Sequence, residues 1–227
     1  MIQINEETAK ERIARRIAAE FDSSENRFVL NLGVGIPTMV ADYVKNSNVY
    51  IQAENGMLGV GPLAAEGRGD WQLINAGRQI VTQTQGCSFF DSSMSFGMIR
   101  GGHVDATVLG AFEVDEQANI ANWIIPNGKQ LGVGGAMDLV SGANRVIVAI
   151  QHLDRKGASK IKHKCVLPIT GFHEADLIVT EYAVFCYENE QLVLKEYAPE
   201  VTLDDILRIT EANYVISPAV KVMEVVV

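Results

Sequence analysis

The chain has little of what builds metal centres and disulfide frameworks. Its 227 residues include only three cysteines and four histidines. Cys87, Cys165 and Cys186 are odd in number and widely separated, and neither residue type recurs at the spacing of a metal site. We therefore expect reduced thiols, no metal ion and no disulfide framework.

The chain also lacks long apolar runs and an excess of positive charge. No apolar stretch reaches the roughly 18 residues of a membrane-spanning helix, and the charged N-terminal segment is not followed by the apolar run of a secretory signal. The net charge of −9 argues against nucleic acid, which binds to basic surfaces. These absences predict a cytoplasmic protein that binds neither membranes nor nucleic acid.

The residues that are present are typical of one globular domain, which we expect to span residues 1–227. Hydrophobic residues make up 48% of the chain and charged residues 21%, so a chain of this length can bury a full core. Residues 6–21 predict an amphipathic helix, because Ala9, Ile13 and Ile17 recur at every fourth position.

The next segments follow the pattern strand, glycine turn, helix, strand. Residues 27–32 and 49–53 are candidate buried strands, and Pro37 suits the first turn of the helix between them. Such a unit predicts an α/β fold with a mixed, largely parallel sheet and helices on both faces. The glycine-rich segment 56–102 yields no clear strand. We expect further strands at 106–109, 145–150, 164–167, 176–180, 183–186, 191–195 and 214–216, and further helices at 91–100 and from Thr202 onwards.

Glu54 stands out because it ends the strand candidate 49–53 and opens a loop with three glycines, ENGMLGVGP (54–62). Open α/β sheets bind ligands at the carboxyl ends of their strands, and glycines let a substrate approach the backbone closely. From this position alone, the carboxylate has three possible roles: to attack a substrate, to hold a ribose, or to cap a turn.

The ribose role depends on the segment GVGIPT (33–38), which is similar to the dinucleotide-binding pattern G-x-G-x-x-G. Glu54 follows this segment at about the distance of a ribose-binding acid. However, Thr38 takes the place of the third glycine, and Pro37 stands inside the phosphate turn. A dinucleotide-binding oxidoreductase domain therefore stays open as an alternative.

A second glycine segment, GVGGAMDLV (132–140), leads into a short helical pattern. The backbone N–H groups of such a turn can stabilise a developing negative charge. Taken alone, the same segment is equally compatible with a flexible turn between two strands.

Several long motifs occur together and in order along the chain. They are NLGVGIPTMVADY (31–43), QAENGMLGVGP (52–62), FFDSSMSFGMIRGGHVDATVLGAFEVDEQANIANWIIP (89–126) and GVGGAMDLV (132–140). On these motifs the chain resembles the β subunit of the class I coenzyme A transferases, which are the acetate/butyrate–acetoacetate and 3-oxoacid enzymes. The resemblance extends over nearly the whole chain, although Ala53 stands where the family usually has serine.

The resemblance implies a CoA-transferase-like fold and a covalent mechanism at Glu54. The Glu54 carboxylate would attack an acyl-CoA thioester to give an acyl-glutamyl anhydride, which the coenzyme A thiolate would convert into a glutamyl-CoA thioester. A second carboxylate would then take up the coenzyme A through the reverse steps. No cofactor is implied, because coenzyme A is itself a substrate.

The resemblance also implies roles for the residues around Glu54 and a partner for the chain. The partner is a CoA-transferase α subunit in an α₂β₂ assembly, with short-chain acyl-CoA and carboxylate substrates. A non-catalytic partner subunit is a further alternative. The implied oxyanion and coenzyme A contacts are Asn31, Gly33, Val34, Gly35, Ile36 and Gly135, and the implied substrate loop comprises Asn55, Gly56 and Gly134.

Overall fold

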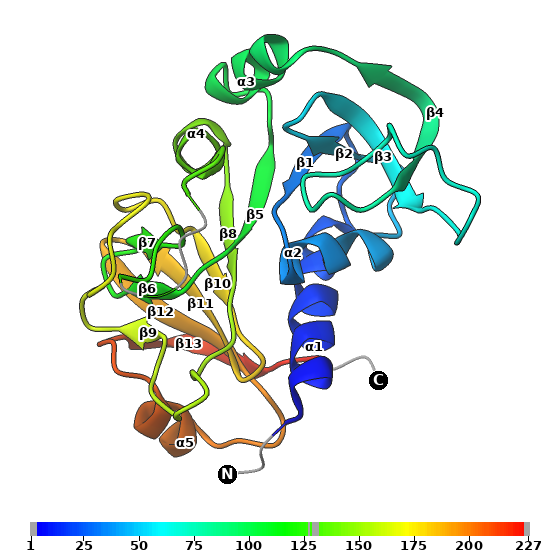
Figure 1. Cartoon of the computed structure of the whole chain (residues 1–227). Helices are drawn as coiled ribbons and strands as arrows, with labels where there is room; N and C mark the ends of the chain where they lie inside the picture. Colours follow the sequence, from blue (N-terminus) through cyan, green and yellow to red (C-terminus); the bar gives the residue numbers. More distant parts are fainter. Residues whose placement is uncertain (1–3, 127, 129–131, 225–227) are drawn as a thin grey trace.

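The computed structural model describes residues 4–126, 128 and 132–224. Over these residues, ten strands form one sheet in the order β13-β12-β11-β10-β8-β5-β1-β2-β3-β4 (Figure 1). The five middle strands, from β10 to β2, run parallel to one another, and most outer pairs are antiparallel. The bounds are β1 (Phe28–Leu32), β2 (Val49–Ala53), β3 (Met57–Leu63), β4 (Val81–Phe89), β5 (Ala106–Gly110), β8 (Val146–Ala149), β10 (Leu177–Val179), β11 (Ala183–Glu188), β12 (Gln191–Tyr197) and β13 (Val215–Val222).

The chain leaves the centre of the sheet in two opposite directions. β1 is followed by β2 on one side, whereas β5 is followed by β8 and then β10 on the other. The carboxyl ends of β1 and β5 therefore flank the point where the strand order reverses, which is where open α/β sheets bind ligands. Glu54 follows β2 at this same edge of the sheet.

Apolar side chains bury both faces of the parallel strands. In β8, Val146 and Val148 belong to the apolar cluster on one face, and Ile147 and Ala149 belong to the cluster on the other. Helix α1 covers the second face, whereas α3, α4 and α5 contribute to the first. The expected fold class, with helices on both faces of a mixed, largely parallel sheet, is confirmed. Over the described residues, the helices are α1 (Glu6–Ala18), α2 (Ile36–Met39), α3 (Ser92–Arg100), α4 (Ala136–Gly142) and α5 (Leu203–Ile209), and the 3₁₀ segments η1 (Ala19–Phe21) and η2 (Val40–Asp42) extend α1 and α2.

The strand predicted at 164–167 is wrong, because this segment is a loop. Its backbone N–H groups donate to carboxylates rather than to a neighbouring strand. Cys165 N–H donates to Asp115 Oδ2 at 3.0 Å, and the next two N–H groups donate to Glu113 Oε2. Both acids belong to a small second sheet, so buried side chains satisfy the loop that the apolar pattern had suggested as a strand. This sheet has the order β7-β6-β9, with β6 (Glu113–Asp115), β7 (Ile120–Ala121) and β9 (Ile161–Lys162).

The segment 56–102, which the sequence left unassigned, contributes two strands as well as α3. β3 pairs with β2 and with β4 in antiparallel fashion, and its register shifts between Leu58 and Val60. A Cβ at Gly59 would lie 2.8 Å from Thr84 Oγ1, so the two strands approach more closely than side chains would allow. The glycines that permit this approach also interrupt the alternation by which strands are recognised.

Candidate active site

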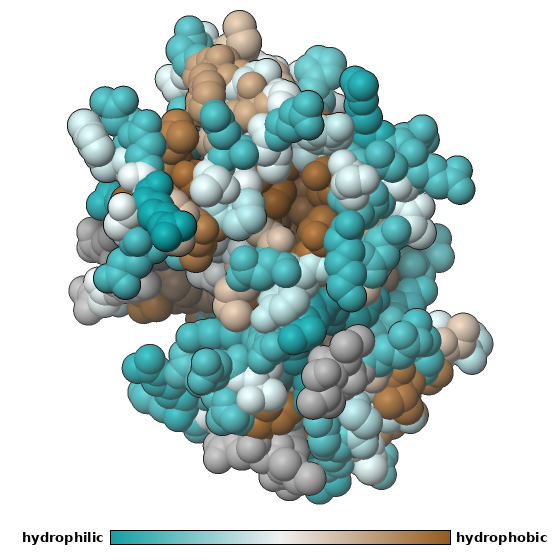
Figure 2. Space-filling view, turned by 90° about the vertical axis from the view of Figure 1, so that its right-hand side faces the viewer, coloured by the Kyte–Doolittle hydropathy of each residue, from teal (hydrophilic) through white to brown (hydrophobic). Residues whose placement is uncertain are grey.

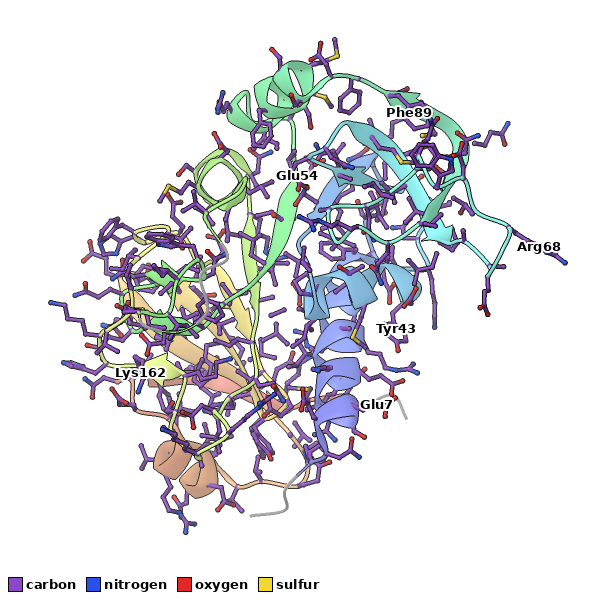
Figure 3. All side chains as sticks on the ribbon, in the orientation of Figure 1. Glu7, Tyr43, Glu54, Arg68, Phe89 and Lys162 are labelled. Atoms are coloured by element: carbon purple, nitrogen blue, oxygen red, sulfur yellow. The ribbon has the colours of Figure 1, made fainter. Side chains whose placement is uncertain are left out.

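Glu54 is half-buried at the carboxyl end of β2. Figure 3 places it at the end of the sheet where β1 and β5 approach α4. Among the described residues, the Glu54 carboxylate has no hydrogen-bond or ion-pair partner. Partial burial of a carboxylate without a partner is unfavourable. The unpaired oxygens of Glu54 are therefore available to a ligand.

A cavity of about 560 Å³ contains Glu54 at the point where the strand order reverses. Its walls are the turn after β1, the ends of β5 and β8, and the start of α4. The structure therefore brings together segments that lie far apart in the sequence. Six of the residues implied by the resemblance line it: Gly33, Val34, Gly35, Ile36, Glu54 and Gly135.

The turn after β1 presents backbone to the cavity. Gly33 N–H donates to Val108 O at 2.9 Å, so β5 already uses this donor. The N–H groups of Val34 and Gly35 have no acceptor within the described ranges. Gly35 has a φ of +92°, which a residue with a side chain rarely adopts. The turn can therefore offer N–H groups to an anion, but not the one from Gly33.

Gly135 brings the second glycine segment against Glu54. A Cβ at this position would lie 3.0 Å from the Phe96 ring and 3.5 Å from Glu54 Cγ. The φ of Gly135 is −89°, so the glycine is required by the lack of space and not by the backbone conformation. The main chain at the start of α4 thus lies directly beside the carboxylate.

The predicted substrate loop does not line the cavity. The Asn55 side-chain amide donates to Ile74 O at 2.8 Å. A Cβ at Gly56 would lie 2.1 Å from Phe90 O, so Gly56 lets the turn between β2 and β3 approach the segment that follows β4. Gly134 has a φ of +51° and open space beside it. The substrate contacts implied for these three residues stay predictions.

Asn31 lies inside the sheet and also does not line the cavity. It is fully buried, and its amide nitrogen donates to Gln52 Oε1 at 2.6 Å. The amide nitrogen of Gln52 in turn donates to Ser95 Oγ at 2.8 Å, and Thr107 Oγ1 donates to Asn31 Oδ1 at 3.3 Å. Donation from Asn31 to a substrate would break the bond to Gln52, so the implied oxyanion role stays a prediction.

Sequence reasoning missed several residues of the site. Gln52 was detectable, because it is an amide within the apolar strand that leads to Glu54. No local signal pointed to Lys10 and Lys160, two cations among the described residues that line the cavity. Burial lowers the pKa of Lys160, which nearby carboxylates oppose. Lys10 is paired with Glu6 at 2.6 Å, so in a chain of net charge −9 Lys160 supplies the local attraction for anionic substrates.

Other chemistry near the site is limited. Within the described ranges, no three His, Cys, Asp or Glu side chains come together in a way that could hold a metal ion. The three cysteines are free thiols, and burial raises the pKa of Cys165, which makes it a poor nucleophile. None of the helices over the described residues combines the length and apolarity needed to cross a bilayer.

Comparison with known proteins decides the family. The profile described as coenzyme A transferase matches residues 10–208. The chain belongs to the coenzyme A transferase family. This transferase chain is 43% identical to a subunit of the probable succinyl-CoA:3-ketoacid coenzyme A transferase of Bacillus subtilis (strain 168), over 93% of the chain and 97% of that protein. It is 47% identical to the β subunit of the acetate CoA-transferase of Haemophilus influenzae, over 96% of each.

Solved structures show the same fold at low sequence identity. An acyl-CoA transferase apoenzyme from Escherichia coli O157:H7 superposes with a TM-score of 0.76 and 23% identity, over 98% of the transferase chain and 45% of that chain. Glutaconate coenzyme A-transferase from Acidaminococcus fermentans superposes with a TM-score of 0.72 and 17% identity, over 96% of the transferase chain and 89% of that chain. A decarboxylase superposes with a TM-score of 0.71 and 17% identity, over 96% and 89%, so the fold alone does not choose the reaction.

The family assignment confirms the resemblance seen in the ordered motifs and makes the protein a CoA-transferase. The dinucleotide alternative is thereby displaced. Its signal came from the turn at 33–35, which lines the Glu54 cavity in this transferase chain. Thr38 Oγ1 donates to Gly33 O at 2.8 Å and closes the turn with a side chain where a dinucleotide site has glycine.

Proposed function

We propose that Glu54 carries coenzyme A between an acyl-CoA donor and a free carboxylate. A Glu54 oxygen attacks the thioester carbonyl, the C–S bond breaks, and coenzyme A leaves as the thiolate. The product is a mixed anhydride between the acyl group and the Glu54 carboxyl. The thiolate then attacks the Glu54 carbonyl of the anhydride, which releases the acyl group as its carboxylate and leaves a glutamyl-CoA thioester.

The second half of the reaction repeats these steps in reverse. The acceptor carboxylate attacks the glutamyl-CoA thioester and displaces the thiolate to form a new anhydride. The thiolate then attacks the acceptor carbonyl and regenerates the Glu54 carboxylate. A carboxylate nucleophile suits this exchange because its anhydride and thioester are both energy-rich, whereas a serine ester would be too stable to pass the group on.

One observation supports the proposal above all others. The Glu54 carboxylate lies in a cavity at the reversal point of the sheet, without a partner among the described residues. A carboxylate with a structural role would be expected to hold an ion pair or a backbone N–H group, as the buried acids Glu113 and Asp115 do.

Tetrahedral oxyanions form in every step and need donors. The N–H groups of Val34, Gly35 and Gly135 lie in the cavity wall and have no acceptor among the described residues. A positioned donor contributes about 3 kcal/mol, or 10²–10³ in rate. Ile36 remains a candidate through the same turn, and Gly33 would contribute by shaping it, because its own N–H group is engaged.

We also propose an α subunit as the partner and short-chain acyl-CoA as the donor, of the acetoacetyl, acetyl or butyryl type. Two bacterial relatives are β subunits of acetate CoA-transferase, and others are subunits of succinyl-CoA:3-ketoacid transferases. The chain matches 42% of the human mitochondrial succinyl-CoA:3-ketoacid coenzyme A transferase 2, so that protein contains a further part of comparable size. An α₂β₂ assembly is the arrangement we propose.

Mass spectrometry of the complex with its α subunit tests the mechanism. After addition of acetoacetyl-CoA, we expect a coenzyme A adduct on the peptide that contains Glu54, which borohydride removes by reduction. Glu54→Ala should abolish the adduct and lower transfer by on the order of 10⁴-fold or more, as removal of other covalent nucleophiles does.

Glu66→Ala is the matched control, because Glu66 is an exposed glutamate in the loop after β3. It should retain both the adduct and the rate. Ternary-complex kinetics without any adduct would contradict the covalent mechanism. Full activity of the complex with Glu54→Ala would instead show that this chain is a non-catalytic partner.

A further inference from the structure

A second cavity, of about 350 Å³, adjoins the Glu54 cavity. Val34, Gly35 and Ala76 line both cavities. Gln52 and Ala53, the two residues before Glu54, line the second cavity. The second cavity therefore lies next to the cavity that contains Glu54.

The walls of this second cavity are apolar. Figure 2 shows a hydrophobic hollow on the side of the molecule that carries β3 and β4. The apolar side chains come from β1, α2 and the three strands β2, β3 and β4. They include Leu32, Met39, Ile51, Val60, Leu63 and Val81.

Most of the polar side chains in the walls already form hydrogen bonds. Thr38 Oγ1 donates to Gly33 O, and Gln52 bonds to Asn31 and Ser95. Asn75 and Gln79 bond to each other at 3.0 Å. Among the described residues, Asp42 supplies the only charged side chain of this lining, and it is acidic. An occupant would therefore find apolar contacts but no cation from this part of the chain.

We propose that this second cavity binds the uncharged aliphatic chain of the acyl group while its carboxyl carbon is at Glu54. The inference rests on the function proposed above and names the substrate class of the same site. The phosphates of coenzyme A do not suit these walls, because Asp42, the only charged side chain among the described lining residues, is itself acidic. Transfer of a hydrocarbon chain from water to such a surface is favourable in free energy. The cavity volume is at the small end of the range for ligand sites, which suits a short chain.

Val60 offers the sharpest test, because it is a buried valine in the wall contributed by β3. Val60→Phe places a ring in the second cavity and leaves the Glu54 cavity unchanged. The complex with the α subunit is assayed with acetoacetyl-CoA as donor and acetate, butyrate or hexanoate as acceptor. We expect kcat/KM to fall about tenfold or more for butyrate and hexanoate and less than about threefold for acetate.

Two further variants complete the design. Val60→Ala enlarges the cavity, and we expect it to raise the ratio of hexanoate to acetate turnover even if the Val60→Phe protein folds poorly. Val215→Phe is the matched control, because Val215 is half-exposed on β13, at the opposite end of the sheet from β3. It should leave the order of acceptors unchanged.

The outcomes separate this inference from the mechanism on which it rests. An equal loss for all three acceptors in Val60→Phe, together with an unchanged acceptor order in Val60→Ala, would overturn the acyl-chain cavity. In that case the coenzyme A adduct on Glu54 would persist. Loss of the adduct from the wild-type complex would overturn the mechanism and the cavity assignment together.

Discussion

At the scale of single residues, the site depends on Glu54 having neither a bonded partner nor a side chain from Gly135 beside it. The carboxylate has no partner among the described residues, and Gly135 leaves room beside its Cγ atom. Buried acids elsewhere in the chain are bound to backbone N–H groups or to arginines. This contrast supports the proposed role of Glu54 as the nucleophile.

Gly135→Ala should reduce activity much more than stability. The new methyl group would lie 3.0 Å from the Phe96 ring, so the ring or the start of α4 must move, and it would contact Glu54 Cγ at 3.5 Å. Displacement of a reacting group can lower the rate by about 10²-fold, and we expect a loss of about 10- to 100-fold in transfer. Overpacking of this kind should lower the free energy of unfolding by only about 1–2 kcal/mol.

Gly97→Ala serves as the control for Gly135→Ala. Gly97 lies within α3, and a Cβ there meets nothing within 4 Å. Because alanine is the better helix former, we expect up to about 1 kcal/mol of added stability and unchanged turnover. Transfer rates and urea denaturation of both variants check the pair. Wild-type activity in Gly135→Ala would refute the close approach of this turn to Glu54.

At the scale of elements, buried polar side chains hold the carboxyl edge of the sheet together. His152, which follows β8, contacts Thr180 after β10 through Nδ1 and Thr210 after α5 through Nε2, both at 3.0 Å. Thr180 Oγ1 donates to Ala183 O, so Nδ1 of His152 is the donor toward Thr180. Burial keeps the imidazole neutral in the folded chain, so Nε2 accepts from Thr210.

Acid should weaken the fold through His152. Burial lowers the pKa of His152 from 6.5 to about 3. As the pH falls, His152 is protonated in the unfolded chain before it is protonated in the folded chain. The stability that comes from the neutral buried imidazole is therefore complete above pH 6.5 and is lost as the pH falls toward 3. For one such group, the free energy of unfolding falls by about 1.4 kcal/mol per pH unit, which is roughly 2 kcal/mol between pH 6.5 and pH 5.

Urea denaturation at several pH values measures this effect. His152→Gln keeps a neutral donor and acceptor but cannot titrate, so its free energy of unfolding should fall less steeply below pH 6.5 than that of the wild type. Burial raises the pKa of the neighbouring Glu181, which acts in the opposite direction in both proteins. Parallel pH curves for the two proteins would show that His152 is not the acid-sensitive group.

At the scale of the whole molecule, ion pairs bind α1 to β12 and to the turn that follows β12. Arg16 Nε donates to Glu196 Oε2 of β12 at 2.7 Å, and Arg16 Nη1 donates to Glu20 Oε1 at 2.6 Å. Arg12 forms a second bridge, to Glu200, at 2.6 Å. The Glu196 side chain is only 6% exposed, so its charge depends on these arginine contacts.

Arg16→Met should therefore destabilise the fold by about 3 kcal/mol, because it leaves Glu196 buried with only Lys221, at 3.4 Å, to compensate among the described residues. Arg208→Met is the control, since Arg208 is 73% exposed in its pair with Asp205 and should change stability by no more than about 0.5 kcal/mol. Urea denaturation at neutral pH compares the two. Equal effects would mean that the bridge of α1 to β12 contributes no more than a surface pair.

Local patterns in the sequence were enough to predict much of the fold. The helix at 6–21, the strands at 49–53 and 106–109 and the hairpin of β11 and β12 all follow from periodicity and turn residues near in sequence. The same applies to the α/β class, because a strand, turn, helix and strand in succession imply a parallel sheet. Glu54 was recognisable because strand-end position and glycine content are both local properties.

Other features follow from contacts between distant segments and were not readable. Glu113 and Asp115 satisfy the loop at 164–167, about 50 positions away in the chain, and thereby replace the strand that local apolarity predicts. β3 and β4 approach each other closely at glycines, which interrupt the alternation of apolar and polar residues by which a strand is predicted.

The sequence by itself determined the family and the layer arrangement, and it singled out Glu54 as the candidate nucleophile, because each depends on residue type and order. The tertiary structure alone decided that Asn31 bonds to Gln52, that Lys10 and Lys160 line the cavity of Glu54, and that an apolar space lies beside it. These facts depend on where strand ends and helix starts meet in space. Adjacency of that kind arises from packing the sheet around its reversal point, and no short stretch of sequence encodes it.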